Sequence, residues 1–280
     1  MLTREKYLWF RDNGPESSRH LEAHGWAVIP GVIGGEELAR LRTEIVEIFE
    51  SPPTVRSPLF TAEDYADFRH ATLNRSPAAQ AAVAHPAILE VIEPLLGEDC
   101  HVIANTSWRN PPHDERAVEG GLWHCDGGPH VPRPADVPWD DRIPYPVFAI
   151  GVHILLDDCP IECGPTGVLA GSHRSGQPPA SHGTADADLQ FEGRGPVPLV
   201  GKAGDVTMFV SDTWHRRLPP TPEGDTGRFF LQIHYGRRDL AQRLEPTASV
   251  NHLSTDAIAR ADTRRKQTVV GLHPPGFYDA

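Results

Sequence analysis

The distribution of apolar residues changes near residue 98, and this change constrains the fold more than any other feature of the chain. Residues 36–50 place leucine, isoleucine and phenylalanine at the spacing of one helical face, and 16–24 and 77–96 also predict helices. From about residue 100 to 237, the apolar runs have the length of strands and are separated by turns. This order predicts a mainly β fold, a sandwich or jelly roll buttressed by N-terminal helices.

The length of the chain suits one domain. We expect a single domain over residues 1–280, made of a helical part at about 1–98, a strand-rich core at about 100–240 and a tail at 241–280. Hydrophobic residues make up 39% of the chain, which is enough to form a core. The tail is polar with scattered apolar residues, and it predicts a final helix at 253–265.

Charge and cysteine content limit the partners and the compartment. Lysine and arginine number 26 against 38 aspartate and glutamate, and 26 − 38 gives a net charge of −12, so the chain repels phosphate backbones and we expect no nucleic-acid partner. The sequence has no apolar run of about 18 residues, which predicts no membrane span, and its start lacks an apolar signal segment. Four scattered cysteines do not suit a disulfide framework, so we expect reduced thiols and a cytoplasmic location.

A triplet and one distant histidine predict a metal site. His124-Cys125-Asp126 supplies an imidazole and a carboxylate two residues apart, and in an extended segment these two side chains project from the same side while Cys125 points away. His215 offers a second imidazole from elsewhere in the fold. Two histidines and one carboxylate form the ligand set of non-haem iron oxygenases, although they can also hold zinc.

The segments around these residues resemble the phytanoyl-CoA dioxygenase family of iron(II)/2-oxoglutarate-dependent oxygenases, from about residue 20 to about residue 240. The matching motifs, in order, are His124-Cys125-Asp126, Gly164-Pro165-Thr166, Gly171-Ser172-His173, Gly204-Asp205-Val206, Trp214-His215 and Arg228. The resemblance implies a double-stranded β-helix, a cupin-like jelly roll with the metal in its mouth. It also implies iron(II), 2-oxoglutarate and dioxygen, with no haem and no flavin, and release of succinate and CO2.

The resemblance also assigns residues to the co-substrate. Arg228 follows the distal histidine by 13 residues (228 − 215), where the family grips the far carboxylate of 2-oxoglutarate, and a guanidinium fork suits a carboxylate. The alternative is a strand-edge arginine in a surface ion pair. Thr166 matches the family threonine that helps to hold 2-oxoglutarate, or serves only its turn. Asn105, on an expected inner strand, is either within reach of the co-substrate or structural.

Four further residues are candidates for the substrate. His153 alternates out of phase with apolar neighbours, so it lines the pocket or is a satisfied core histidine. His130, Trp139 and Arg142 belong to the proline-rich segment 127–146, which begins directly after Asp126. Prolines restrict the backbone, so we expect an ordered loop that forms the substrate wall, or else a surface loop or subunit contact.

Two residues depart from the family pattern. Gly121 stands where many relatives have glutamine, and Arg217 stands where they often have a small or hydroxylated residue. Asp126, which related halogenases lack, favours hydroxylation or another oxidation of a small-molecule metabolite. The alternatives are a non-catalytic jelly-roll sensor of 2-oxoglutarate or metal and a zinc hydrolase, over which Arg228 favours the oxygenase. No feature of the sequence selects an oligomeric state.

Overall fold

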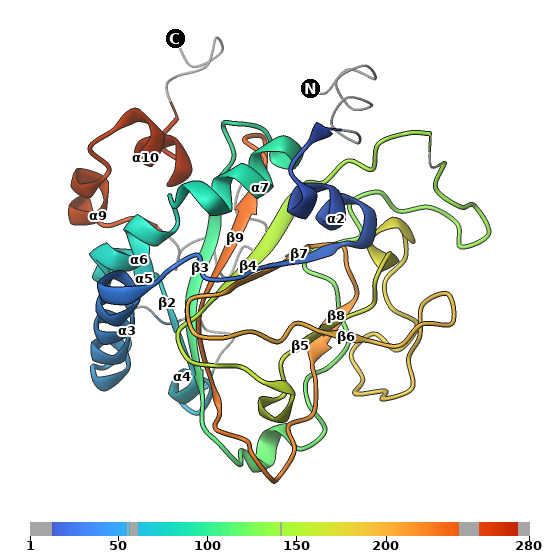
Figure 1. Ribbon diagram of the computed structural model, residues 1–280, viewed down its shortest axis with the longest axis horizontal. Helices are drawn as coiled ribbons and strands as arrows, with labels where there is room; N and C mark the ends of the chain where they lie inside the picture. The colour runs from blue at the N-terminus through green and yellow to red at the C-terminus, as the bar shows by residue number, and fades with distance from the viewer. Residues whose placement is uncertain (1–12, 55, 57–60, 141, 241–251, 274–280) are drawn as a thin grey trace.

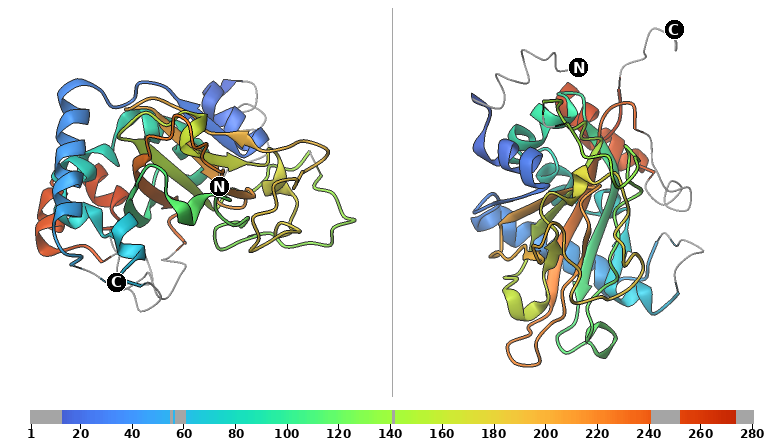
Figure 2. Two further views of the ribbon diagram at one scale, coloured as in Figure 1. Left: turned by 90° about the horizontal axis from the view of Figure 1, so that it is seen from below. Right: turned by 90° about the vertical axis from the view of Figure 1, so that its right-hand side faces the viewer.

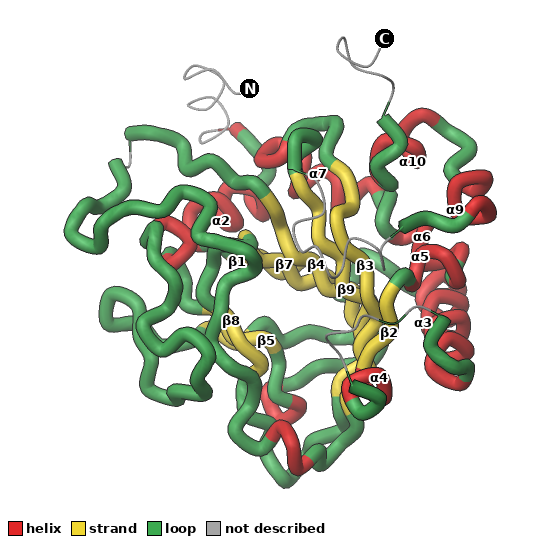
Figure 3. Tube along the Cα trace, turned by 180° about the vertical axis from the view of Figure 1, so that it is seen from behind, coloured by secondary structure: helices red, strands yellow, loops and turns green. Residues whose placement is uncertain are grey.

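The computed structural model describes residues 13–54, 56, 61–140, 142–240 and 252–273. Two antiparallel sheets lie at its centre (Figure 1). The large sheet contains, in spatial order, β1 (Trp26–Ile29), β7 (Val206–Val210), β4 (Ala149–Leu155), β9 (Arg228–Gly236), β3 (His101–Asn110) and β2 (Phe68–His70). The small sheet contains β6 (Val197–Pro198), β5 (Thr166–Val168) and β8 (His215–Arg217), and it lies apart from the large one (Figure 3).

The helices gather on one side of the large sheet, and long loops extend at its other end (Figure 2). Their bounds are α2 (Glu16–His24), α3 (Gly35–Glu50), α4 (Asp64–Asp67), α5 (Thr72–Arg75), α6 (Pro77–Ala82), α7 (Pro86–Leu96), α9 (Thr255–Arg260) and α10 (Arg264–Val269). Single turns of 3-10 helix are η1 (Glu115–Ala117), η2 (Ile161–Cys163) and η3 (Ser172–Arg174). Within the described residues, none of the helices has both the length and the apolar character needed to cross a bilayer.

Local sequence explains where the N-terminal helices begin and end. α2 ends at Gly25, which adopts φ 81°, a left-handed conformation that glycine accepts without a steric penalty. α6 begins after Ser76, whose hydroxyl accepts a hydrogen bond from the backbone N–H of Ala79. α7 begins with Pro86 in its first turn, where the missing N–H costs nothing. The predicted helices at 16–24, 36–50 and 77–96 are therefore confirmed, the last as two helices.

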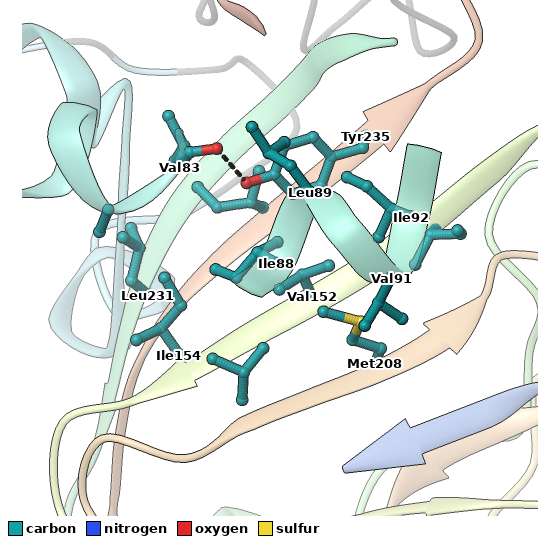
Figure 4. Close-up of a cluster of buried hydrophobic side chains, with 14 of the residues drawn as sticks. Val83, Ile88, Leu89, Val91, Ile92, Val152, Ile154, Met208, Leu231 and Tyr235 are labelled. Carbon is teal, nitrogen blue, oxygen red and sulfur yellow. Dashed lines mark hydrogen bonds between the residues drawn. The ribbon is translucent and has the colours of Figure 1, made fainter. Parts of the chain in front are cut away.

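The main hydrophobic core lies between the helices and one face of the large sheet. Figure 4 shows α7 placing Ile88 and Ile92 toward the strands, where Leu231 and Val152 belong to the same buried cluster. The Tyr235 hydroxyl donates a hydrogen bond to the Val83 carbonyl (2.8 Å), which satisfies the one polar group that this ring brings into the core.

Because side chains alternate along a strand, a second set of residues points to the face of the large sheet opposite the helices. In β4, Val152 and Ile154 belong to the core beneath the helices, so Gly151 and His153 point to the other side. In β9, the same rule sends Arg228, Phe230, Gln232 and His234 to that side. We call it the inner face.

Two details differ from the sequence-based expectation. His124 forms an isolated bridge with His215 and does not belong to a longer strand. The tail helix expected at 253–265 is interrupted: α9 ends at Arg260 and α10 starts at Arg264, with Thr263 capping the second helix through a bond from Lys266. The remaining tail, 241–251 and 274–280, lies outside the described residues. The mainly β expectation is confirmed at the level of a large antiparallel sheet.

Candidate metal and co-substrate site

The two predicted histidine ligands are held opposite each other by the backbone. His124 N–H donates to the His215 carbonyl (3.1 Å), and His215 N–H donates to the His124 carbonyl (2.9 Å). The two rings lie with centroids 4.2 Å apart. A residue pair that exchanges both hydrogen bonds has a fixed register, so the fold brings together two imidazoles separated by 91 positions in sequence (215 − 124).

Both rings have the same orientation. The Nδ1 atom of His124 lies 2.7 Å from the Leu122 carbonyl oxygen, and the Nδ1 atom of His215 lies 2.8 Å from the Thr213 carbonyl oxygen. A carbonyl can only accept, so each Nδ1 carries the proton and each Nε2 keeps its lone pair. Such a carbonyl partner is the usual device that orients a metal-binding histidine.

Asp126 completes the group. Its Oδ1 lies 3.7 Å from Nε2 of His124, and its Oδ2 lies 3.7 Å from Nε2 of His215. Among the described residues, these three are the group whose ligand atoms lie within 4.8 Å of one another. Two ligands each about 2.1 Å from one ion lie within about 4.2 Å of each other, so the measured separations suit a single metal ion.

The neighbours of the triad anchor it from behind. Trp123 and Trp214, which adjoin His124 and His215, point away from the triad and share a small buried cluster with Leu169. The Trp123 indole N–H donates to the Asp186 carbonyl (2.6 Å), so the loop around residues 175–198 also holds this segment. Cys125 is buried and its thiol donates to the Gly128 carbonyl (3.2 Å), in agreement with its expected outward direction.

The environment favours a neutral His215 beside an ionised Asp126. Burial, and then the nearby His124, lowers the pKa of His215 to about 4. Burial alone would raise the pKa of Asp126, but the imidazoles of His215 and His234 reverse that effect and hold this pKa below its ordinary value. At neutral pH His215 therefore offers an imidazole lone pair and Asp126 a carboxylate, the protonation states that metal binding requires.

His234 is a member of this site that the sequence analysis did not assign. Its Nε2 lies 2.9 Å from Oδ2 of Asp126, and its side chain is 17% exposed. The position shares the inner face with Arg228, which is the signal that could have identified it. The residue opposite it on β4 is Gly151. A Cβ at Gly151 would lie 2.6 Å from the Phe209 ring, so the absence of a side chain lets that ring lie over Gly151. The Phe209 ring also packs against His215, with centroids 4.3 Å apart.

Arg228 is buried at the start of β9 on the inner face. Its Nε and Nη2 atoms donate to Oδ1 of Asn110 (3.1 and 2.8 Å), and its guanidinium lies over the Phe230 ring, 5.3 Å from the centroid. No ion pair to Arg228 occurs within the described part of the chain, which disfavours the surface ion pair alternative. Burial, and then the charge of Arg217, lowers the pKa of Arg228 to about 9.

A continuous wall of rings joins Arg228 to the triad. His153 contacts Phe230 (centroids 4.5 Å apart) and Phe209 (5.5 Å), and Phe209 contacts His215. His153 is 6% exposed, and its Nε2 is buried with no hydrogen-bond partner among the described residues. Burial, and then the charge of Arg228, holds its pKa well below the ordinary value, so the ring is neutral. The expectation that His153 faces the interior agrees with this position.

The structure places Thr166 in the sheet that carries His215 and turns Asn105 away from the inner face. Thr166 is buried in β5 directly opposite Arg217 of β8, in the small sheet that also carries His215. Asn105 pairs with Ile233, a core residue, and its amide oxygen accepts a hydrogen bond from Leu73 N–H. The Asn105 side chain thus lies on the helix-covered face. We therefore withdraw it from the co-substrate residues, because an inner strand presents only alternate residues to the pocket.

The structure brings one of the three loop residues close to the triad segments. His130 donates its backbone N–H to Asp212 (2.9 Å), and its Nδ1 makes a short contact with the same carboxylate. Tyr145 also donates to Asp212 (2.8 Å), so both ends of segment 127–146 are tied to the turn that precedes His215. The ring of His130 stacks on Phe148 and is engaged in this structural role.

The other two loop residues are not brought into contact with the triad. The Trp139 indole N–H donates to the Ile143 carbonyl (2.7 Å), and the ring packs edge-on against Tyr145. Arg142 pairs with Asp140 and its side chain is 87% exposed, so in this conformation it belongs to the outer surface of the loop.

Several solved structures share the fold at low sequence identity. The carbocyclase SnoK from nogalamycin biosynthesis is 19% identical, covering 87% of this chain and 92% of that chain, with a TM-score of 0.59. EctD from S. alaskensis, solved with 2-oxoglutarate and 5-hydroxyectoine, is 20% identical over 81% and 78% of the two chains, with a TM-score of 0.60. The epimerase SnoN, solved with Fe3+, alpha ketoglutarate and nogalamycin RO, is 18% identical over 79% and 82%, with a TM-score of 0.56.

No curated protein sequence is significantly similar to the chain. The sequence profile of the phytanoyl-CoA dioxygenase (PhyH) family matches residues 21–218, a range that contains the whole triad. The chain therefore belongs to the phytanoyl-CoA dioxygenase family, and with it to the iron- and 2-oxoglutarate-dependent enzymes.

Proposed function

We propose that this protein oxidises a C–H bond of a small-molecule metabolite, by hydroxylation or a related oxidation, with conversion of 2-oxoglutarate to succinate and CO2. In this proposal His124, Asp126 and His215 hold iron(II), and Arg228 and Thr166 hold the co-substrate. The paired sheets support a double-stranded β-helix with these residues at its mouth. The solved structures that share the fold include one with 5-hydroxyectoine and one with nogalamycin RO, so a small-molecule substrate fits as well.

One observation carries the proposal: the triad and a buried guanidinium are joined by one wall on the inner face. The wall runs from Arg228 through Phe230, His153 and Phe209 to His215. A buried cation is costly without an anionic partner, and 2-oxoglutarate has a carboxylate at each end. A zinc hydrolase would need the open metal position but not the distant guanidinium.

The residues then have separate tasks. Iron(II), when bound, supplies the activation of dioxygen. The carbonyl groups of Leu122 and Thr213 keep the ligand rings oriented, and the Phe230–His153–Phe209 wall excludes water on one side. His124 is 44% exposed on its side chain, so the site opens to solvent past this ligand, which gives the substrate a path to it.

We further propose that segment 127–146 forms one wall of the substrate pocket. Asp212 ties this segment to the metal site through His130 and Tyr145. Trp139 packs inside the segment while Arg142 points outward, so Trp139 is the stronger candidate for shaping the pocket. Trp139→Ala should depress substrate oxidation and leave metal binding and substrate-free decay of 2-oxoglutarate nearly intact. Equal coupled turnover in the variant and the wild type would contradict this role.

The central experiment measures succinate and oxidised product separately. Purified protein with iron(II), 2-oxoglutarate and dioxygen is incubated with pools of small metabolites, and products are detected by mass spectrometry. Arg228→Ala should raise the apparent KM for 2-oxoglutarate far more than it changes metal affinity, and Arg228→Lys should rescue it only in part, since lysine offers a point charge and not a fork. Arg194→Ala, at an exposed position, is the matched control.

The outcomes separate the enzyme from its main alternative. Succinate formation that depends on Arg228 supports the oxygenase. Binding of 2-oxoglutarate without succinate formation under any substrate pool would support a sensor, and a 2-oxoglutarate titration unchanged by Arg228→Ala would remove Arg228 from the site.

A further inference from the structure

A second arginine, Arg217, lies in the small sheet that carries His215. In β8, Arg217 follows His215 by two residues, so both side chains project from the same side of the small sheet, the side of the triad. Thr166 is paired directly opposite Arg217 and shares that side. Burial, and then the charge of Arg217, lowers the pKa of Arg228, which agrees with two guanidinium groups that face the same space.

Arg217 is half-buried, and part of its guanidinium lacks hydrogen-bond partners in the described part of the chain. Its Nε and Nη2 atoms are buried, and neither has a hydrogen-bond partner among the described residues. The two acids whose charges act on it most, Asp114 and Asp225, are already engaged. Asp114 binds Arg116, and Asp225 accepts the backbone N–H groups of His113 and Gly227.

Arg228 also keeps donors available. Asn110 occupies its Nε and Nη2 atoms from one side, which leaves the Nη1 end of the fork. Like charges near each other and N–H donors without partners both cost free energy, and an anion that reaches both guanidinium groups would offset both costs.

We propose that Arg217 and Arg228 form a two-arginine clamp on the distal carboxylate of 2-oxoglutarate, with Arg217 acting as a specificity-determining residue. This inference rests on the proposed function of the site. A carboxylate has two oxygens with about four acceptor positions, so it can accept hydrogen bonds from two forks at once. The clamp makes selection for a five-carbon diacid stricter than a single arginine would, because a co-substrate without the distal carboxylate leaves both guanidinium groups without that anion.

Gly121 makes room for this arrangement. Its N–H donates to the Arg217 carbonyl (2.9 Å), and a Cβ at this position would lie 3.2 Å from the Arg217 backbone nitrogen and 3.3 Å from its Cβ. A side chain at residue 121 would therefore press on the strand that carries the arginine. The two positions at which the sequence departs from the family pattern are in contact, and the departure at one accommodates the other.

The test compares two ligands that differ only at the distal carboxylate. Binding of 2-oxoglutarate and of 2-oxopentanoate to cobalt(II)-loaded protein is measured by calorimetry for the wild type and for Arg217→Gln. We expect Arg217→Gln to weaken the binding of 2-oxoglutarate by about tenfold to a hundredfold, which is the effect of losing a hydrogen bond to a charged group. The affinity for 2-oxopentanoate should change by less than about twofold. Without ligand, the variant should unfold at the same temperature as the wild type or higher, since a like-charge contact is removed.

Arg216→Gln is the matched control. Arg216 is the neighbour of Arg217 on β8 but points to the other side, where it lies over the Trp123 ring. Its loss should lower stability and leave the preference for 2-oxoglutarate unchanged. Provided that the wild type binds 2-oxoglutarate, either of two results would overturn the clamp. Arg217→Gln could weaken the binding of both ligands equally, or it could leave the binding of 2-oxoglutarate unchanged. Failure of the wild type to prefer 2-oxoglutarate over 2-oxopentanoate would instead overturn the proposed function, and the clamp with it.

Discussion

Replacing His234 by leucine should weaken metal binding without removing a ligand. His234 donates to the Asp126 carboxylate at 2.9 Å, and its side chain is only 17% exposed, so water cannot fully replace the lost hydrogen bond. A hydrogen bond to a charged group contributes about 1.5–3 kcal/mol, which corresponds to roughly tenfold to a hundredfold in affinity. Loss of an outer partner of a metal ligand typically costs the same factor. We therefore expect the dissociation constant for the metal to rise by about ten- to a hundredfold.

The assay titrates apo protein with cobalt(II) against a competing chelator and records the visible absorption of the bound ion. His234→Gln is the matched variant, because its amide N–H can still donate to Asp126 and should restore part of the affinity. The spectrum of the bound ion should keep its shape in both variants, since the ligand set is unchanged.

Two results would refute this reasoning. A metal affinity of His234→Leu equal to that of the wild type would show that Asp126 does not need the hydrogen bond from His234. Complete loss of binding, as deep as that caused by removing Asp126, together with a changed spectrum, would show that His234 is itself a ligand and not a positioning residue.

Three further predictions concern the same region. Asp126→Ala should lose the single bound iron(II) on dialysis, and retention of one ion per chain would remove this residue from the ligand set. Gly151→Ala should lower the free energy of unfolding by about 1–3 kcal/mol in urea titrations, because its Cβ would displace the Phe209 ring, and a neutral effect would contradict that packing. Burial lowers the pKa of His173 to about 3, so the unfolded chain binds a proton below about pH 6.5 that the folded chain does not. The apo protein should lose about 1.4 kcal/mol per pH unit through this residue as pH falls from 6.5, and His173→Gln should flatten that slope.

Local chemistry in the sequence was sufficient for the N-terminal helices and for placing His124 and Asp126 together. The helix bounds follow from apolar spacing and from residues such as Gly25 and Pro86, whose effect on the backbone does not depend on distant parts of the chain. His124 and Asp126 are two residues apart, so any extended backbone places them on one side. The matching motifs and the profile of the phytanoyl-CoA dioxygenase family likewise depend on the order of residues.

Tertiary structure alone decided which other residues meet the site. Asn105 and His234 both lie on strands next to the pocket, but the register between β3 and β9 turns Asn105 toward the helices and His234 toward Asp126. A shift of one residue would exchange the two faces, and the strand sequences do not exclude it locally. Arg217 and Arg228 belong to two different sheets, so whether they face the same space depends on how those sheets are placed and cannot be read from either strand.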